Sequence, residues 1–219
     1  MMAPPERSPE RDSAIEAMLE HVGFDGWTPT ALRRGLAAIG ADPSEAALLF
    51  PGGAADMIAA WCDLEDRRMA EAMAAPGMAA LRLSGRVRAA IVLRLARTRR
   101  HKEAVRRALA ELALPGRAAV AAACTARTVD AIWHAAGDQA ADMSWYTKRA
   151  TLAAVYAATV LFWLRDTSED DAATLAFLDR RLAGVGRIGK LRARLTGGPR
   201  RPVPVPHGGA ALHPGGDAA

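Results

Sequence analysis

The chain has few of the features that mark disulfide-rich, zinc-binding or membrane-spanning proteins. It contains only two cysteines, Cys62 and Cys124, and neither belongs to a CxxC pair. We interpret both as small core residues of a reduced, intracellular protein. The uncharged run Ala150 to Leu164 has fifteen residues, whereas a membrane-spanning helix needs roughly 20. It is therefore predicted to be a buried central helix.

Alternating segments of Val, Ile and Thr bounded by turns are also missing. The composition is rich in Ala, Leu and Arg, with 51% hydrophobic and 24% charged residues. These proportions are typical of a globular protein, and Ala, Leu and Arg favour helices. The sequence therefore predicts an all-α fold.

Signals for export are lacking at the N-terminus. The opening MMAPPERSPERDSA has no apolar core of a signal peptide, and its acidic residues disfavour a mitochondrial transit peptide. We expect a disordered arm over residues 1–12 of a cytoplasmic protein.

Enzymatic motifs are equally scarce. None of the five histidines has HxxxH, ExxH or HxH spacing, so the paired Glu-x-x-His helices of a di-iron site are absent. GxSxG, P-loop and Rossmann motifs are absent as well. His134 is interpreted as an ordinary core or surface histidine. We therefore predict a protein without catalytic residues, metal site or cofactor.

Pro, Gly and capping residues predict how the N-terminal part is organised. A first helix is expected from Ser13 to Val22, a second from Thr28-Pro29 to Ile39 and a short third one ending at Phe50. Two short helices joined by a tight turn are typical of a helix-turn-helix. We therefore predict a helix-turn-helix-like subdomain over residues 13–75.

This order of elements resembles the N-terminal domain of TetR-type regulators. The resemblance is carried by Gly23-Phe24, by Leu32 to Ile39, and by Phe50 with the Pro-Gly-Gly turn after it. A DNA-recognition helix needs polar or basic residues at its start. Here it is PSEAALLF, with Ser44 and Glu45 followed by apolar residues. We expect a TetR-like architecture without nucleic-acid binding, and a ligand-responsive TetR-type regulator stays open as the alternative.

The break at Pro76-Gly77 predicts a larger helical domain over residues 78–184, for ligand binding and dimerisation. Arginines recur at helical spacing in its first helix, and we interpret them as a solvated face. They are Arg82, Arg86, Arg88, Arg94 and Arg97. Further along, Thr167 or Ser168 is expected to cap a helix whose acidic first turn, residues 169–171, complements the helix dipole.

Residues 130–166 hold six of the eleven aromatic residues, and they include the predicted central helix. Small side chains share one face of that helix: Ala150, Ala153, Ala154, Ala157 and Ala158. Larger side chains lie on the other side. Two interpretations stay open: the packed core of a purely structural dimerisation protein, or a helix with an apolar ligand on its large face and a second subunit on its small face.

Residues 185–219 are predicted to be a basic amphipathic segment followed by a disordered tail. Ile188, Leu191 and Leu195 fall on one side and basic residues on the other, a pattern that suits an anionic membrane surface. The predicted membrane-contacting residues are Arg187, Ile188, Lys190, Leu191, Arg194 and Leu195.

The segment VDAIWHAAGDQAADMSWYTKRATLAAVY and the residues after it carry a more specific resemblance. They are similar to an accessory family of ubiquinone biosynthesis, the ninth of the coenzyme Q proteins. The matching elements are Ala136-Gly137-Asp138, Asp142-x-x-Trp145-Tyr146-Thr147-Lys148-Arg149 and Leu178-Asp179-x-Arg181. The resemblance extends from about Ser13 to Leu182. It implies a TetR-like homodimer that has lost DNA binding, has no activity of its own and binds an isoprenoid or quinone lipid, or a phospholipid. It further implies that the protein presents demethoxyubiquinone to a di-iron hydroxylase at the membrane.

The resemblance also suggests where the sites lie. The implied partner-binding patch is Asp142, Met143, Trp145 and Tyr146, with Ile132 beside it. For the lipid site we predict the large face of the central helix and the tryptophan before it: Leu152, Val155, Tyr156, Thr159, Trp163 and Trp133. The expected location is the cytoplasmic side of a bacterial inner membrane, as a peripheral protein.

Overall fold

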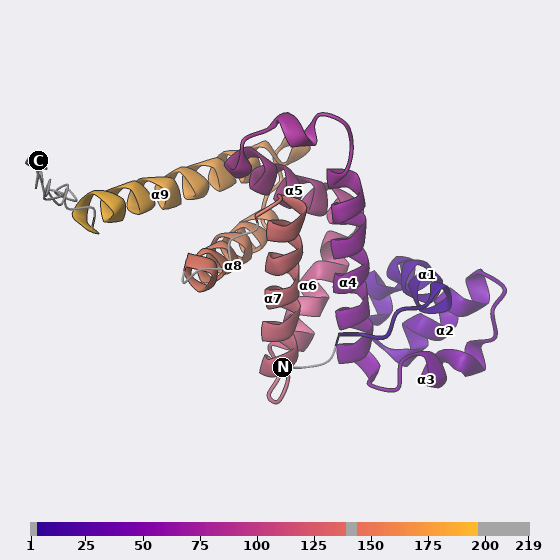
Figure 1. Cartoon of the computed structure of the whole chain (residues 1–219). Helices are drawn as coiled ribbons and strands as arrows, with labels where there is room; N and C mark the ends of the chain where they lie inside the picture. Colours follow the sequence, from indigo (N-terminus) through magenta and orange to yellow (C-terminus); the bar gives the residue numbers. More distant parts are fainter. Residues whose placement is uncertain (1–3, 139–143, 197–219) are drawn as a thin grey trace, which may run out of the picture. The chain divides into compact units, whose positions relative to one another are not determined.

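The computed structural model describes residues 4–138 and 144–196 of the protein. Within these ranges it describes side chains except those of Ser144, Trp145 and residues 185–196. The described residues form helices and turns, with no strand among them, so the predicted all-α fold is confirmed. The α-helices are α1 (Pro9–Asp25), α2 (Pro29–Ala38), α3 (Ala46–Leu49), α4 (Gly53–Met73), α5 (Leu83–Thr98), α6 (Lys102–Leu112), α7 (Ala118–Ala135), α8 (Ser144–Trp163) and α9 (Ala172–Thr196) (Figure 1).

The chain divides into two compact units, Met1–Val185 and Gly186–Ala219. The predicted boundary at Pro76-Gly77 is a turn inside the first unit, where Gly77 adopts a φ of 96°. Only residues without a Cβ adopt that conformation easily. The predicted subdomain over residues 13–75 and the predicted domain over residues 78–184 therefore belong to one compact unit.

Helix α1 begins earlier than the sequence analysis placed it. The Ser8 hydroxyl accepts a hydrogen bond from the backbone N–H of Arg11, and Pro9 takes the first helical position. Arg11 is buried, and its guanidinium pairs with Asp56 at 2.7 Å. The predicted disordered arm over residues 1–12 is wrong for residues 9–12, because a serine cap and a buried ion pair hold them in the helix.

One hydrophobic cluster joins α1, α2 and α3 to the first half of α4 and to α6. Gly35 lets α1 and α2 approach closely, because a Cβ at this position would lie 2.6 Å from the backbone nitrogen of Met18. Trp27 packs against Trp61 with ring centroids 5.1 Å apart, and its indole N–H donates to the carbonyl of Ala104 at 3.0 Å. The helix-turn-helix-like region is thus tied to α6 by its core.

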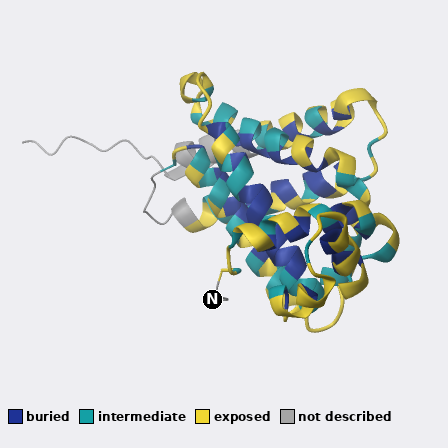
Figure 2. Cartoon of the chain, turned by 90° about the vertical axis from the view of Figure 1, so that its right-hand side faces the viewer, coloured by how far each residue is buried: buried dark blue, intermediate teal, exposed yellow. Residues whose placement is uncertain are grey.

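A second cluster joins the end of α4 to α5, α7, α8 and α9. Helix α4 contributes to both clusters and therefore connects them. Figure 2 shows buried positions recurring along the helices, with exposed positions on outer faces and in turns. This is the pattern of amphipathic helices around a shared core.

The acidic turn before α9 differs in part from the prediction. Ser168 precedes the turn 169–171 as expected, but its hydroxyl makes no cap hydrogen bond to that turn and accepts instead from the N–H of Ala173 in α9 at 3.0 Å. Asp170 and Asp171 have φ values of 52° and 55°, outside the helical region. Asp171 instead accepts hydrogen bonds from Arg99 and Lys102, both at 2.8 Å. Asp170 and Asp171 therefore form ion pairs with Arg99 and Lys102, near the start of α6, instead of forming the first turn of α9.

Helix α9 runs through Gly184, where we expected a separate segment to begin, and continues to Thr196. The predicted membrane-contacting residues 187–195 lie in this helix, outside the described side chains. Among the described residues no single helix is long and apolar enough to cross a membrane; one pair, Pro43–Leu49 with Gly53–Met73, meets both criteria only when joined across an 81° bend.

Candidate functional site

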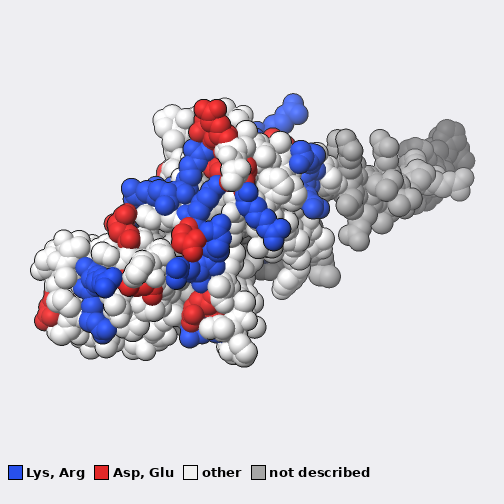
Figure 3. All heavy atoms as spheres, turned by 180° about the vertical axis from the view of Figure 1, so that it is seen from behind, with Lys and Arg blue, Asp and Glu red and all other residues white. Residues whose placement is uncertain are grey.

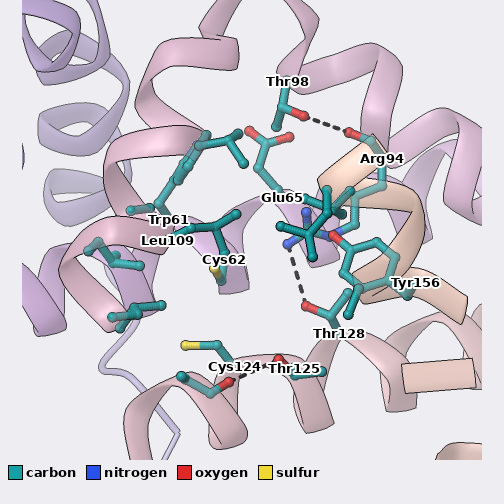
Figure 4. Close-up of a pocket in the computed structure, with 18 of the residues that line it drawn as sticks. Trp61, Cys62, Glu65, Arg94, Thr98, Leu109, Cys124, Thr125, Thr128 and Tyr156 are labelled. Atoms are coloured by element: carbon teal, nitrogen blue, oxygen red, sulfur yellow. Dashed lines mark hydrogen bonds between the residues drawn. The ribbon is translucent and has the colours of Figure 1, made fainter. Parts of the chain in front are cut away.

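A cavity of about 370 Å³ lies among α4, α5, α6, α7 and α8 (Figure 4). Much of its wall is apolar, with Ile58 and Trp61 from α4, Leu109 from α6 and Val160 from α8. Leu161 on α8 lines the cavity and is 59% exposed, and Leu109 on α6 lines it and is 38% exposed. The cavity therefore opens to the surface between α6 and α8, through an apolar mouth.

A buried ion pair supports one wall of the cavity. The Nε atom of Arg94 on α5 donates to Oδ1 of Asp66 on α4 at 2.7 Å, and Thr128 on α7 donates to the other carboxylate oxygen at 2.9 Å. Arg94 lines the cavity, and Asp66 lies behind it. Burial raises the pKa of Asp66, and Arg94 opposes that effect. Arg94 itself is buried. The prediction that it belongs to a solvated arginine face is therefore wrong.

Tyr156 brings a hydroxyl to the same wall from α8. The guanidinium carbon of Arg94 lies 5.6 Å from the centre of its ring. Burial raises the pKa of Tyr156 to about 12, although the positive charge of Arg94 acts in the opposite direction. The hydroxyl therefore stays protonated at neutral pH and can donate a hydrogen bond.

Both cysteines line the cavity, a role that their sequence positions did not suggest. They are free thiols, and Cys124 is buried. Contact with Cys124, together with burial, raises the pKa of Cys62 well above its ordinary value. Hydrogen bonding from Cys62 lowers the pKa of Cys124 to about 7, and a guanidinium nitrogen of Arg127 lies 3.4 Å from its sulfur. One reactive thiol therefore sits inside the cavity.

Of the residues predicted to bind lipid, Tyr156 alone lines this cavity. Leu152, Val155 and Trp163 are buried in the second core cluster, and Trp133 packs against it half-buried. Thr159 is fully buried and donates to the carbonyl of Val155. These five side chains lie against protein and not against this cavity, which meets α8 at Tyr156, Ala157, Val160 and Leu161.

The predicted partner patch is described only in part. Tyr146 is 70% exposed near the start of α8, as a docking residue requires. Ile132 is completely buried, so the structure contradicts its place on a partner surface. Trp145 belongs to α8 but its side chain, like all of Asp142 and Met143, lies outside the described residues.

The alanine face of α8 is uncovered over part of its length. Ala150, Ala154 and Ala157 are exposed, whereas Ala153 and Ala158 are half-buried. A second subunit on this face stays a prediction.

The predicted recognition helix offers apolar side chains to solvent. Leu48 on α3 is 85% exposed and Ile39 after α2 is 51% exposed. Nearby, Arg34 pairs with Asp25 at 2.7 Å. On the face in Figure 3, acidic side chains interrupt the basic ones. Among the described residues no group of three or more His, Cys, Asp or Glu side chains could hold a metal ion.

Comparison with known proteins gives a consistent picture. The COQ9 family model matches residues 118–189. The ubiquinone biosynthesis protein COQ9, mitochondrial, of Homo sapiens is 33% identical over 80% of this chain, and that of Rattus norvegicus is 32% identical over 80%. The Schizosaccharomyces pombe protein coq9 is 33% identical over 81% of this chain and 70% of its own length. The chain spans only 57% and 58% of the human and rat proteins.

The fold is similar to that of a bacterial regulator. The crystal structure of the TetR transcriptional regulator from Nitrosomonas europaea superposes with a TM-score of 0.67, over 82% of this chain and 99% of the other, at 24% identity. This likeness confirms the predicted TetR-like fold and, at such low identity, says nothing about activity.

Proposed function

Since the chain belongs to the COQ9 family of ubiquinone biosynthesis proteins, we propose that it is a non-catalytic accessory protein that binds an isoprenoid quinone precursor. In this proposal it presents demethoxyubiquinone to a di-iron hydroxylase at a membrane. The observation that carries it is the apolar cavity among α4 to α8, with its mouth between Leu109 and Leu161.

The cavity supports lipid binding by its size and chemistry. Its volume of about 370 Å³ falls within the range of pockets that hold small molecules, roughly 300–1,000 Å³. Each CH₂ group that leaves water contributes about 0.8 kcal/mol, so ten buried carbons contribute roughly 8 kcal/mol before the entropy cost of association is subtracted. An apolar mouth also lets a longer tail leave the cavity without desolvating a charge.

The exposed parts of α8 suggest how the lipid is passed on. Tyr146 is accessible on the same helix that lines the cavity, and an exposed aromatic side chain is a common anchor of protein interfaces. We place the hydroxylase on the patch of Asp142, Met143, Trp145 and Tyr146, and a second copy of the chain on the alanine face. Basic residues of α9 between 187 and 195 would hold the protein on anionic lipid, as a peripheral protein of a bacterial inner membrane.

The fold alone would also suit a TetR-type regulator. The exposed residues at 44–48 argue against that role, because only Ser44 carries a hydroxyl donor, while Glu45 would repel phosphate and Ala47 and Leu48 are apolar. Salt-dependent binding to one sequence in a random DNA library would favour the regulator.

Lipid retained by the purified protein tests the proposal. Ala157 is exposed at the mouth of the cavity, and Ala150 is exposed two turns away on the same helix without lining the cavity. We expect mass spectrometry to find an isoprenoid or quinone lipid in the wild type and in Ala150→Trp, and much less in Ala157→Trp. Absence of lipid from all three proteins would contradict lipid binding.

A further inference from the structure

Three polar side chains of the cavity lie on the same side. In Figure 4, Arg94, Thr128 and Tyr156 lie together, whereas Trp61 and Leu109 lie on the opposite side. A ligand in this cavity therefore meets two different environments. One is a wall with several hydrogen-bond donors. The other is mostly apolar, with the indole N–H of Trp61 as its single buried donor without a partner in the described part of the chain.

Two donors on the polar side are not used by the protein. The hydroxyl of Tyr156 makes no hydrogen bond within the described part of the chain. Arg94 uses Nε for Asp66 and Nη2 for Thr128, which leaves its Nη1 without a partner there. Neither atom belongs to the fully enclosed donors of the described chain, so both keep some access to open space and suit an oxygen atom supplied by a ligand.

The charges around these donors indicate which kind of ligand oxygen the site can accept. The positive charge of Arg94 is already balanced by Asp66 at 2.7 Å. Glu65, the acidic residue of the lining, is paired with Arg97 at 3.1 Å. A phosphate or carboxylate would therefore enter a site without a free compensating charge and would lose its hydration. A carbonyl, ether or phenol oxygen carries no such penalty.

From this geometry we propose that Arg94 and Tyr156 form a head-group subsite for the oxygen of an uncharged ring, with the hydrocarbon tail directed along α6 to the mouth. The inference rests on the proposed lipid binding and adds which end of the held lipid lies inside, so the ring has to leave this subsite before the hydroxylase can act on it. It predicts selection of oxygen-bearing, neutral head groups over both pure hydrocarbons and phospholipids.

Two probes with one tail test the subsite. Decylubiquinone carries the expected oxygens on a ring whose carbons are all substituted, so that the cavity thiols have no free ring position to add to, and decylbenzene lacks these oxygens. In calorimetric titrations of the delipidated protein we expect the quinone to bind more tightly, and Tyr156→Phe to weaken its binding about three- to tenfold, the worth of one hydrogen bond. Binding of decylbenzene should not change. Far-ultraviolet circular dichroism and the melting temperature check that the variant is folded.

Thr125→Val is the matched control. Thr125 also lines the cavity, but its hydroxyl already donates to the carbonyl of Ala121 at 3.0 Å, so its loss should leave both affinities unchanged. Equal affinity for the two probes, or an equal loss for both in Tyr156→Phe, would overturn the subsite while leaving lipid binding intact. Tighter binding of a short-chain phosphatidylglycerol than of the quinone would overturn it as well. Failure of every probe to bind the wild type would overturn lipid binding itself.

Discussion

The Nε atom of Arg94 lies 2.7 Å from Oδ1 of Asp66, and both side chains are about nine-tenths buried. The pair joins α5 to α4, and Thr128 extends it to α7. The same guanidinium forms part of the cavity wall. One buried contact therefore joins three helices and also shapes a wall of the cavity.

We expect Arg94→Met to lower the free energy of unfolding by about 3–5 kcal/mol, because it leaves the charge of Asp66 buried without a partner. The double variant Arg94→Met with Asp66→Leu should recover most of that loss. Arg88→Met is the control, since Arg88 pairs with Asp179 at the surface, with side chains 39% and 51% exposed. It should cost less than about 1 kcal/mol. Urea unfolding measures all four proteins, and equal losses for Arg94→Met and Arg88→Met would contradict the assignment.

The second prediction concerns acid sensitivity at Asp171. Burial by itself would raise the pKa of this carboxyl, but hydrogen bonds from Lys102 and Arg99 outweigh it and hold the pKa below the ordinary value of 3.8. A carboxyl with a lowered folded pKa stabilises the protein above its unfolded pKa, and that stability is lost as the pH falls through the folded pKa. Asp171→Asn should therefore lower stability by roughly 1.5 kcal/mol at pH 7.

The difference between Asp171→Asn and the wild type should shrink as the pH falls from 5 to 2. Glu169→Gln is the control, because Glu169 is exposed in the same turn and makes no ion pair within the described residues. The free energy of unfolding of Glu169→Gln should match that of the wild type over the whole pH range. A constant difference between Asp171→Asn and the wild type over this range would show that ionisation of Asp171 contributes nothing.

Helical spacing predicted most of the fold, but it could not predict the polar wall of the cavity. The cap at Thr28 and the break after Phe50 were recognisable because both signals are local. Arg94 and Asp66 lie 28 residues apart on different helices, and no spacing in the sequence connects them. Among the recurring arginines of α5, burial of Arg94 depends on where α4 and α7 pack. The position of the cavity along α8 could not be predicted for the same reason, since periodicity defines a face without telling whether protein or a cavity covers it.

A third prediction uses the thiol inside the cavity. Because hydrogen bonding from Cys62 lowers the pKa of Cys124 to about 7, about half of this thiol is ionised at pH 7 and reacts as thiolate. Alkylation of Cys124 by iodoacetamide, followed by mass spectrometry, should show a midpoint near pH 7. In Cys62→Ala the midpoint should move toward the ordinary thiol value of 9.0.

Occupation of the cavity should protect Cys124 from alkylation. Adding decylubiquinone, whose ring has no free position for addition of a thiolate, is expected to slow the reaction several-fold in the wild type. It should have less effect in Ala157→Trp, whose cavity mouth is blocked. Equal rates with and without ligand in the wild type would place the lipid elsewhere.

The fourth prediction separates two exposed aromatic side chains. Tyr146 is 70% exposed on α8, and Phe24 is 85% exposed at the end of α1. If the hydroxylase docks on α8, Tyr146→Ala should weaken its binding by about 2 kcal/mol, roughly 30-fold, as expected when an aromatic anchor is truncated. Phe24→Ala removes a comparable apolar side chain from the helix-turn-helix-like region and should leave the affinity unchanged. Surface plasmon resonance with the immobilised hydroxylase measures both, and the lipid content of each variant should match the wild type because neither residue lines the cavity. The reverse result would be weaker hydroxylase binding by Phe24→Ala and unchanged binding by Tyr146→Ala. It would move the docking surface to the exposed apolar residues of α1 to α3, where a TetR-type regulator would contact DNA.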